Sequence, residues 1–406
     1  MRRGTNLLAV GGFNQAVILD LIRRAPQGLS RVEIAGATGL SAQTVSNVSR
    51  RLIDSGIVLE AGKLNVGPGK PRTLLQLEPT GLYSIGVHLD PTVITYVLLD
   101  LAGDVVTDHR APLPANATPD SIIREMAERI AAILEDSVVP HDRVLGVGIA
   151  APGPVDAALG ILLDPPLLDG WTRVPLREAL ADATGFPVVL EKDVAAAAVA
   201  EIWTGGGGER DNFAFFYYGT GIGMGLVIDR DVLRGSSNNA GDMGHIRVAP
   251  TGPLCSCGRR GCIGELVVPH RLVAEAVETG IIAEGPPASS VDDDFSRFSD
   301  VAADGSAGAI AILDRTAAHI AAAVVVITNL LDVDRVIFGG PFWQRVSARV
   351  LPTIAELVNA DPALISPHPI EVSDSAIGED VAAIGAGCLV LDHFLSPRPS
   401  ALLISE

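Results

Sequence analysis

The sequence predicts a mixed α/β protein that begins with a small domain of helices and a hairpin. Within Met1–Thr80, two segments have apolar residues at helical spacing, and an alternating hairpin follows them. From Tyr83 onward, short apolar strands alternate with helices, which is typical of an α/β fold with mixed sheets. The charge changes sign at the same boundary. Met1–Thr80 carries ten Lys and Arg against five Asp and Glu, whereas the remainder carries 20 against 43.

A basic head on an acidic body suggests that only the head meets an anionic polymer, although small domains often carry a few excess charges. The net charge of the 406 residues is −18, and the length suffices for two or three domains. No apolar run approaches the ~20 residues of a membrane span. We therefore expect Ala195–Ala200 and Ile320–Ile327 to be buried helix faces. With no signal peptide visible, we expect a soluble cytoplasmic protein without a membrane partner.

The first elements of the head form a helix-turn-helix pattern. Asn14–Arg24 has helical periodicity and is followed by Pro26 and Gly28. Ser30 caps the next helix, with Glu33 as its capping-box partner. After a turn at Gly39, Ser41 caps a second short helix, which ends at Gly56.

The outward face of that second helix carries polar groups and then guanidinium groups, which suits base-edge and phosphate contacts in a major groove. Ile57–Leu77 alternates around a Gly/Pro tip and is expected to form a basic hairpin, the wing of a winged helix. The alternative is a small helical domain for protein contacts. The predicted contacts to double-stranded DNA come from Ser41, Gln43, Thr44, Ser46, Asn47, Arg50 and Arg51 of the helix and from Lys63, Lys70 and Arg72 of the wing.

The body is expected to open with strands that meet at turns and to continue with alternating helices and strands. We expect a loop at Pro286–Ser306, because this segment is polar and acidic. The other predicted elements, in order, are two strands within Ser84–Val106, a helix at Ser121–Ser137, strands at Arg143–Ala150 and Pro187–Glu191, a helix from Asp193, strands at Asn212–Tyr218 and Leu226–Asp229, a helix at Gly308–Leu331, a strand at Arg335–Phe338 and a helix at Gly378–Leu391.

Three of the four cysteines lie within Cys255–Cys262, and His245 lies ten residues upstream. Thiolates and an imidazole at this spacing are typical ligands of a tetrahedral Zn²⁺. A disulfide would leave one of the three thiols unpaired, and incidental buried cysteine is the other alternative. The predicted ligands, His245, Cys255, Cys257 and Cys262, would close the coordination shell, so we expect structural zinc.

The body resembles the ROK family, which comprises sugar kinases and the sugar-responsive repressors built from them. The resemblance covers nearly the whole chain, and Met1–Thr80 matches the winged-helix transcriptional regulators of the family. It implies an actin-like fold of two lobes with a cleft between them. The lobes would comprise residues 81–193 with 379–406, and residues 194–378 with the zinc site. The motifs that carry it are GTGIGMG (Gly219–Gly225), AGDMGH (Ala240–His245), CSCGRRGC (Cys255–Cys262), FGGP (Phe338–Pro341) and GEDVAAIGAG (Gly378–Gly387).

The resemblance also implies which kinase features are kept. Asp193 matches the catalytic base of the family kinases, although an Asp there is also a natural helix N-cap. In the phosphate loop, His88 replaces an acid, and Asp90 and Pro91 replace glycines. An Asp repels phosphate, and a Pro has no N–H to donate to it. We therefore predict no kinase activity and no catalytic residue.

The family's sugar contacts map onto Lys192, Asp193, Asp242, His245 and Gly264, with Glu265 beside the last. Three of these five positions depart from the family pattern. Lys192 favours an anionic ligand such as a sugar phosphate, or else pairs with Glu191 or Asp193. The predicted effector-binding residues are Lys192, Asp193, Asp242, His245 and Glu265.

The main hypothesis is a homodimeric, or dimer-of-dimers, transcriptional regulator, and the resemblance to the family implies a repressor. It would bind an operator and respond to a sugar or sugar-derived effector. One alternative is an ATP-dependent sugar kinase with an added DNA-binding head. Another is a regulator whose cleft is vestigial and whose signal is a protein partner on the acidic body.

Overall fold

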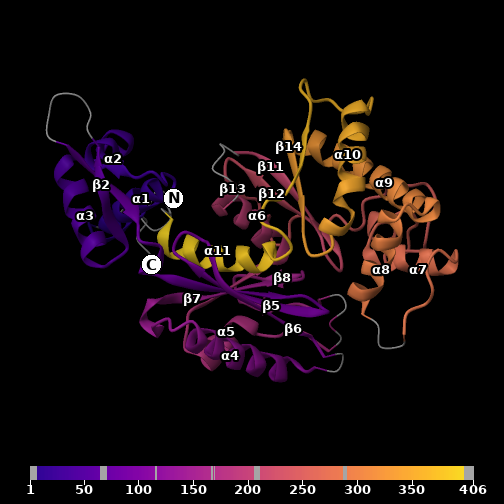
Figure 1. The fold of residues 1–406 in the computed structure, drawn as a ribbon, viewed down its shortest axis with the longest axis horizontal. Helices are drawn as coiled ribbons and strands as arrows, with labels where there is room; N and C mark the ends of the chain where they lie inside the picture. Colours follow the sequence, from indigo (N-terminus) through magenta and orange to yellow (C-terminus); the bar gives the residue numbers. More distant parts are fainter. Residues whose placement is uncertain are drawn as a thin grey trace.

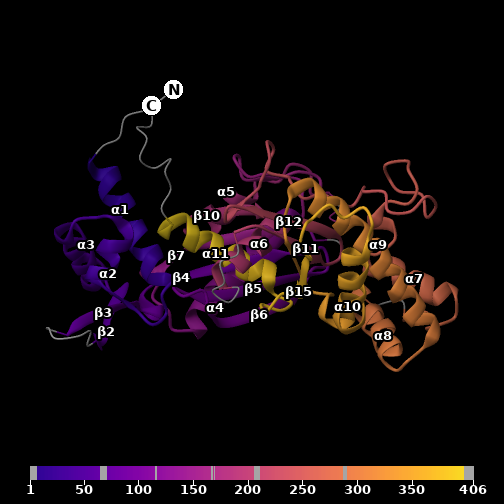
Figure 2. The ribbon, with the colours of Figure 1, turned by 90° about the horizontal axis from the view of Figure 1, so that it is seen from above.

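The computed structural model describes residues 7–64, 71–114, 117–165, 168, 170–204, 211–286 and 290–396. A small head lies at one end of an elongated molecule, and two α/β lobes follow it (Figure 1). The second view, turned by 90°, shows the same order along the long axis (Figure 2).

The head is a winged helix. Its core is formed by the inner faces of three helices and by the hairpin, with Ile18, Ile34 and Val45 fully buried. The capping box of Ser30 and Glu33 is present, and Ser41 caps the recognition helix as predicted. The elements are α1 (Leu7–Arg23), β1 (Leu29–Ser30), α2 (Arg31–Thr38), α3 (Ala42–Asp54), β2 (Val58–Leu64) and β3 (Arg72–Leu77), with the strands in the order β1-β3-β2.

The two lobes repeat one sheet topology. In each, three antiparallel strands follow one another in sequence, and two further strands then pair in parallel beside the first of them. The first sheet has the order β10-β7-β4-β5-β6 and the second β13-β12-β11-β14-β15. The strands are β4 (Tyr83–Leu89), β5 (Val93–Asp100), β6 (Val105–Pro112), β7 (Val144–Ala151), β10 (Val188–Lys192), β11 (Phe213–Tyr218), β12 (Ile222–Ile228), β13 (Asp231–Val232), β14 (Arg335–Gly339) and β15 (Glu371–Asp374).

Helices cover the outer faces of both sheets. The first sheet packs against α4 and α5, and the second against α7 to α10, so each lobe has its own apolar core. The bounds are α4 (Pro119–Asp136), α5 (Leu176–Thr184), α7 (Pro269–Glu278), α8 (Val291–Ala303), α9 (Ala307–Leu331) and α10 (Gln344–Ala360). The shorter elements are η1 (Pro79–Gly81), η2 (His141–Arg143), η3 (Ile263–Glu265) and the two-stranded β8 (Val155–Asp156) and β9 (Ile161–Leu162).

Two helices lie between the sheets: α6 (Asp193–Thr204) and α11 (Val381–Leu395). They cross in direct backbone contact, since a Cβ on Gly385 would lie 1.9 Å from the Ala196 carbonyl oxygen. On its other side α11 meets the first sheet as closely, because a Cβ on Gly148 would lie 1.8 Å from the Ala386 carbonyl oxygen. Any side chain at these glycines would push the layers apart.

The prediction of a loop at Pro286–Ser306 is wrong, because most of this segment forms α8. Ser290 and Asp293 make a capping box, and Phe295 and Phe298 are fully buried at helical spacing. The acidic residues of the first turn are favoured there by the helix dipole, and we had interpreted them as a loop signal.

The long helix α9 is apolar and long enough to cross a bilayer by length and composition. It packs instead in the core of the second lobe, where Ile320, Ala323 and Val324 are fully buried. The run Ile320–Ile327 therefore lies on a core helix, as expected from its composition.

Candidate functional site

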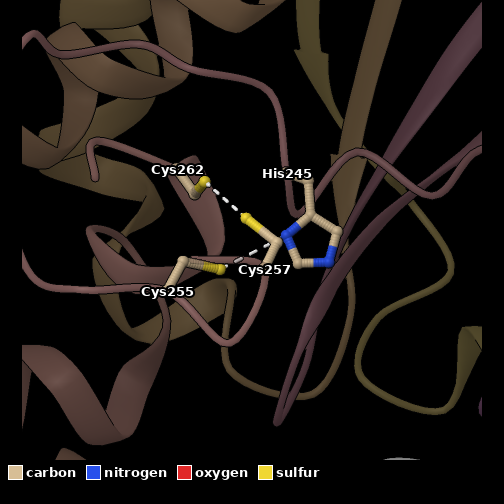
Figure 3. A group of neighbouring side chains, drawn as sticks. All are labelled: His245, Cys255, Cys257 and Cys262. Atoms are coloured by element: carbon tan, nitrogen blue, oxygen red, sulfur yellow. Dashed lines mark hydrogen bonds between the residues drawn. The ribbon is translucent and has the colours of Figure 1, made fainter. Parts of the chain in front are cut away.

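The metal-ligand candidates converge on one point. The Nδ1 of His245 and the sulfur atoms of Cys255, Cys257 and Cys262 all lie within 4.8 Å of one another. Figure 3 shows the sulfur atoms gathered on one side of the imidazole, with the second ring nitrogen directed away from them.

Backbone pairing builds this metal loop (residues 240–265). Ile263 N–H donates to the Ile246 carbonyl oxygen, and a tight turn returns the chain between Cys255 and Arg259. Gly258 and Gly261 have φ of +79° and +78°, a conformation that favours glycine. At Gly261 there is also no room for a side chain, since a Cβ would lie 1.9 Å from the Ala249 carbonyl oxygen.

The donor set fits Zn²⁺. A tetrahedral ion with Zn–S bonds of about 2.3 Å holds its sulfurs about 3.8 Å apart, and Cys257 and Cys262 have their sulfurs 3.7 Å apart. That separation excludes a disulfide between them, because a disulfide needs about 2 Å. Burial raises the pKa of Cys262 to about 11, whereas the Cys257 N–H lowers the pKa of Cys255 to about 7. A bound zinc ion would draw all the thiols to the thiolate form.

A cavity of about 400 Å³ adjoins the metal loop, and we call it the interlobe cavity. Its wall includes every predicted effector residue: Lys192, Asp193, Asp242, His245 and Glu265. The first lobe contributes Asp90 and Pro152, and the second contributes Tyr217 and Thr220.

Asp193 is the first residue of α6 and follows β10 directly, so its carboxylate is placed where a strand ends and a helix begins. Its Oδ1 accepts a hydrogen bond of 2.7 Å from the Val194 N–H. Burial raises the pKa of Asp193 to about 6, although the positive charge of Lys192 opposes this shift. The carboxylate can accept hydrogen bonds from ligand hydroxyls when it is ionised.

Lys192 does not pair with Glu191, which was one alternative from the sequence. Arg234 takes that role, with its Nε 2.5 Å from the Glu191 carboxylate. The Lys192 side chain is 8% exposed, and its Nζ lies 3.5 Å from the Asn239 carbonyl oxygen at the cavity wall. Asn239 also binds the backbone N–H and carbonyl of Val155, which ties the two lobes together.

The turn between β4 and β5 is closed by its own side chains. The Asp90 carboxylate accepts hydrogen bonds from the Thr92 N–H at 2.9 Å and from the Thr92 hydroxyl at 2.6 Å. The Thr220 hydroxyl donates to the same carboxylate from the other lobe. Burial lowers the pKa of the neighbouring His88, whose Nε2 lies 3.4 Å from the Tyr217 hydroxyl.

In the head, the outward face of α3 carries the predicted DNA contacts. Gln43 donates to Asn47 at 2.9 Å, and the Ser41 hydroxyl is engaged as the helix cap. Ser46 is half-buried, Lys63 is exposed on β2, Arg72 is half-buried on β3, and Lys70 is outside the described residues. An open hollow on this face is lined by Thr44, Asn47, Val48, Arg50 and Arg51, together with Asn14 of α1.

Sequence reasoning missed Asn14, Asn239, Arg234 and Thr220 as wall or supporting residues. Thr220 lies in the GTGIGMG motif, but its partner Asp90 is 130 positions away. No local pattern marks such a pair.

Comparison with protein families gives two matches. A model of the ROK family matches residues 84–393, and a model described as winged helix-turn-helix DNA-binding matches residues 17–58. The two matches cover the body and the head.

Among individual proteins, the chain is 26% identical to the xylose repressor of Bacillus subtilis (strain 168) over 386 residues, which is 94% of this chain and 96% of that protein. It is 30% identical to a glucokinase of Thermotoga maritima over 321 residues, covering 76% of this chain and 97% of the kinase. The crystal structure of a ROK family transcriptional regulator, described as a homolog of the E. coli MLC protein, superimposes with a TM-score of 0.77 at 23% identity and covers 95% of this chain and 98% of its own.

Proposed function

The chain belongs to the ROK family, and on that premise we propose that it is a DNA-binding transcriptional repressor controlled by a sugar or sugar-derived effector. The observation that carries this proposal is that the same chain contains a capped, exposed recognition helix and a polar cavity between two lobes. The xylose repressor match covers 94% of this chain, whereas the glucokinase match covers 76% of it.

Arg50 and Arg51 support DNA binding because both are exposed beside Asn47 on the recognition helix. The test is a mobility-shift titration with the DNA upstream of the protein's own gene at low salt. We expect Arg50→Ala to weaken binding by about 1–3 kcal/mol. Arg24→Ala is the control, since Arg24 pairs with Asp20 on α1. The proposal fails if the wild-type protein does not bind this DNA.

The effector side is supported by the acceptors and donors in the cavity wall. We propose that Asp193, Asp242, Glu265, His245 and Lys192 contact the ligand, with zinc fixing His245 so that its Nε2 faces the cavity. Thermal-shift assays with D-xylose and D-glucose, the sugars suggested by the relatives, are the first test. A bound ligand raises the melting temperature by mass action. A vestigial cleft would show no shift with any sugar.

The helix α6 extends from the cavity wall to the head. Asp193 begins the helix at the cavity wall, and Trp203 near its end stacks under the Arg23 guanidinium of α1 at 4.0 Å. Leu395 at the end of α11 packs against the cores of both the head and the helix pair. We propose that effector binding moves these ends against α1. The coupling is reciprocal, so bound DNA changes effector affinity by the same factor.

We further propose a cytoplasmic homodimer, or a dimer of dimers, whose two heads bind two half-sites related by its two-fold axis. Light scattering coupled to size exclusion, with and without DNA, tests the even-numbered state. A monomer on DNA would contradict it.

A sugar kinase is the second candidate, and the raised pKa of Asp193 at the base position favours it. Against it, Asp90 occupies the phosphate loop and Pro91 has no N–H for a phosphate oxygen. We therefore propose no phosphoryl transfer. A coupled ATP-consumption assay decides the matter, with Asp193→Asn as the background. Turnover above that background would establish a kinase.

A further inference from the structure

Two hydrogen bonds join the lobes at the inner end of the cleft. The Thr220 hydroxyl, from the β11–β12 turn of the second lobe, lies 3.0 and 2.9 Å from the two carboxylate oxygens of Asp90 in the first lobe. Beside it, the Tyr217 hydroxyl of the second lobe lies 3.4 Å from the Nε2 of His88 in the first lobe. Asp90, Thr220 and His88 are each at most 7% exposed, so water does not compete strongly for these bonds.

Asp90 also lies at the boundary between two cavities. It lines the interlobe cavity and a second cavity of about 340 Å³, whose wall includes Thr92, Arg110 and Arg345. The carboxylate therefore stands where the two spaces approach each other. A hydroxyl group on the other lobe holds it there.

We propose that Asp90 and Thr220 form an interlobe latch, a hydrogen bond that holds the two lobes together when no nucleotide is bound. The charge of Asp90 also makes the cleft prefer uncharged sugars over sugar phosphates. This inference rests on the proposed function for its ligand class, but the latch itself does not. The reasoning follows from charge: a phosphate near this boundary would meet the Asp90 carboxylate and, beyond it, Asp193. A sugar hydroxyl, in contrast, can donate to either carboxylate.

Lys192 favours the opposite preference, for a sugar phosphate over an uncharged sugar. Its ammonium group lies in the same cavity and would attract a phosphate. However, four carboxylates line that cavity, namely Asp90, Asp193, Asp242 and Glu265. Within the described part of the chain, only the last of them has its charge balanced by an arginine, Arg271. Lys192 also lies close enough to Asp193 to lower its pKa, so part of its charge is already compensated.

The chain offers a matched pair of variants for the latch. The hydroxyls of Thr92 and Thr220 both donate to Asp90, but only the Thr220 bond crosses between lobes. Thr220→Val removes that hydroxyl at nearly constant volume, Thr220→Ser restores it, and Thr92→Val is the control.

The first measurement is hydrogen–deuterium exchange of the full chain without ligand. We expect Thr220→Val to accelerate exchange in both turns, at residues 88–92 and 217–223, and Thr220→Ser to reverse this. Thr92→Val should accelerate exchange only in residues 88–92. If Thr220→Val leaves the amides of the opposite lobe unchanged, the latch is refuted, whatever the ligand.

The second measurement is calorimetric titration of the same proteins and of Asp90→Asn with D-glucose, D-xylose and glucose 6-phosphate. We expect wild-type protein to prefer the uncharged sugar, and Asp90→Asn to reduce this preference about tenfold or more, because the charge is lost while the shape is kept. Tighter binding of glucose 6-phosphate than of glucose by the wild-type protein would overturn the selectivity. If none of the three probes binds, the sugar-effector proposal fails for them, and the exchange experiment still decides the latch.

Discussion

The metal loop and the β4–β5 turn border the same cavity, and they differ in what holds them. The metal loop places three cysteine sulfurs and one histidine nitrogen at distances that suit Zn²⁺. The β4–β5 turn carries Asp90 and Pro91 where the family resemblance implies glycines, and it is held by hydrogen bonds from Thr92 and Thr220. Under the proposed function, the difference teaches that one wall of the cavity positions a ligand, whereas the turn that would otherwise meet a phosphate has a structural role.

Removing the metal is the experiment with the largest expected effect on this difference between the two regions. We expect Cys257→Ser to lower the free energy of unfolding by more than about 4 kcal/mol, because structural zinc contributes directly to folding. Effector response should be lost with it, since His245 is no longer fixed. Metal analysis and calorimetric melting measure the first effect.

Two controls accompany that experiment. Cys388→Ala removes a buried thiol from α11, away from the metal-ligand cluster, and should leave the zinc content unchanged. The head should still bind DNA non-specifically, since its core is separate from that of the second lobe. Full effector response in zinc-free protein would show that the loop does not position the sensing residue.

A pH titration tests Asp193, which stands between the two regions. Its folded-state pKa of about 6 lies above the unfolded value near 4. The folded state therefore keeps the proton up to a higher pH than the unfolded state does, and stability falls as the pH rises from about 4 to about 6, by up to about 3 kcal/mol from this group.

Asp193→Asn should flatten this part of the stability curve, measured by urea unfolding at several pH values. Effector affinity should change in the opposite sense, rising with pH through about 6 as the carboxylate becomes ionised. An identical pH profile in Asp193→Asn would mean that another group is responsible.

A smaller effect is expected at the contact that we propose couples the cavity to the head. Trp203→Leu removes the ring beneath Arg23, and this cation–π contact is worth about 1 kcal/mol. We expect the effector-induced change in DNA affinity to shrink by about that amount, while affinity for DNA without effector changes little. Arg24→Gln, next to Arg23 but more exposed, is the matched control. Equal coupling in wild-type and Trp203→Leu proteins would exclude this route.

The smallest effect should come from Pro91→Gly, which restores a backbone N–H but leaves Asp90 in place. We expect no gain in nucleotide affinity and a loss of stability of about 0.5–1 kcal/mol, because glycine increases the entropy of the unfolded chain. Binding of a non-hydrolysable ATP analogue can be measured by calorimetry. A clear gain in affinity would show that Pro91, not Asp90, excludes phosphate.

Local patterns in the sequence were enough to predict the head and to single out the His245 and cysteine cluster that could hold a metal. Ser30 with Glu33, Ser41, and the Cys255–Cys262 cluster each act over a few residues, so their spacing carries the information. The mixed α/β class and the family followed from the order of elements and from short motifs.

The remaining features depend on contacts between distant segments. The α8 helix was missed because its acidic first turn outweighed the buried Phe295 and Phe298 in our interpretation. The Asp90–Thr220 pair and the Arg234–Glu191 pair join positions 130 and 43 apart, respectively, and no periodicity reveals them. Lys192 shows the same limit, since only the structure assigns its neighbour Glu191 to another partner.

The crossing of α6 and α11 determines how far a change in the cleft can travel. Because Gly385 and Ala196 touch through their backbones, the two helices cannot pack more closely, and we expect them to move as one rigid unit. With 12 residues, α6 is about 18 Å long. A lobe rotation of about 15°, within the range of known allosteric transitions, would displace its far end by about 5 Å. That is one helical turn, enough to move a recognition helix out of register with its groove.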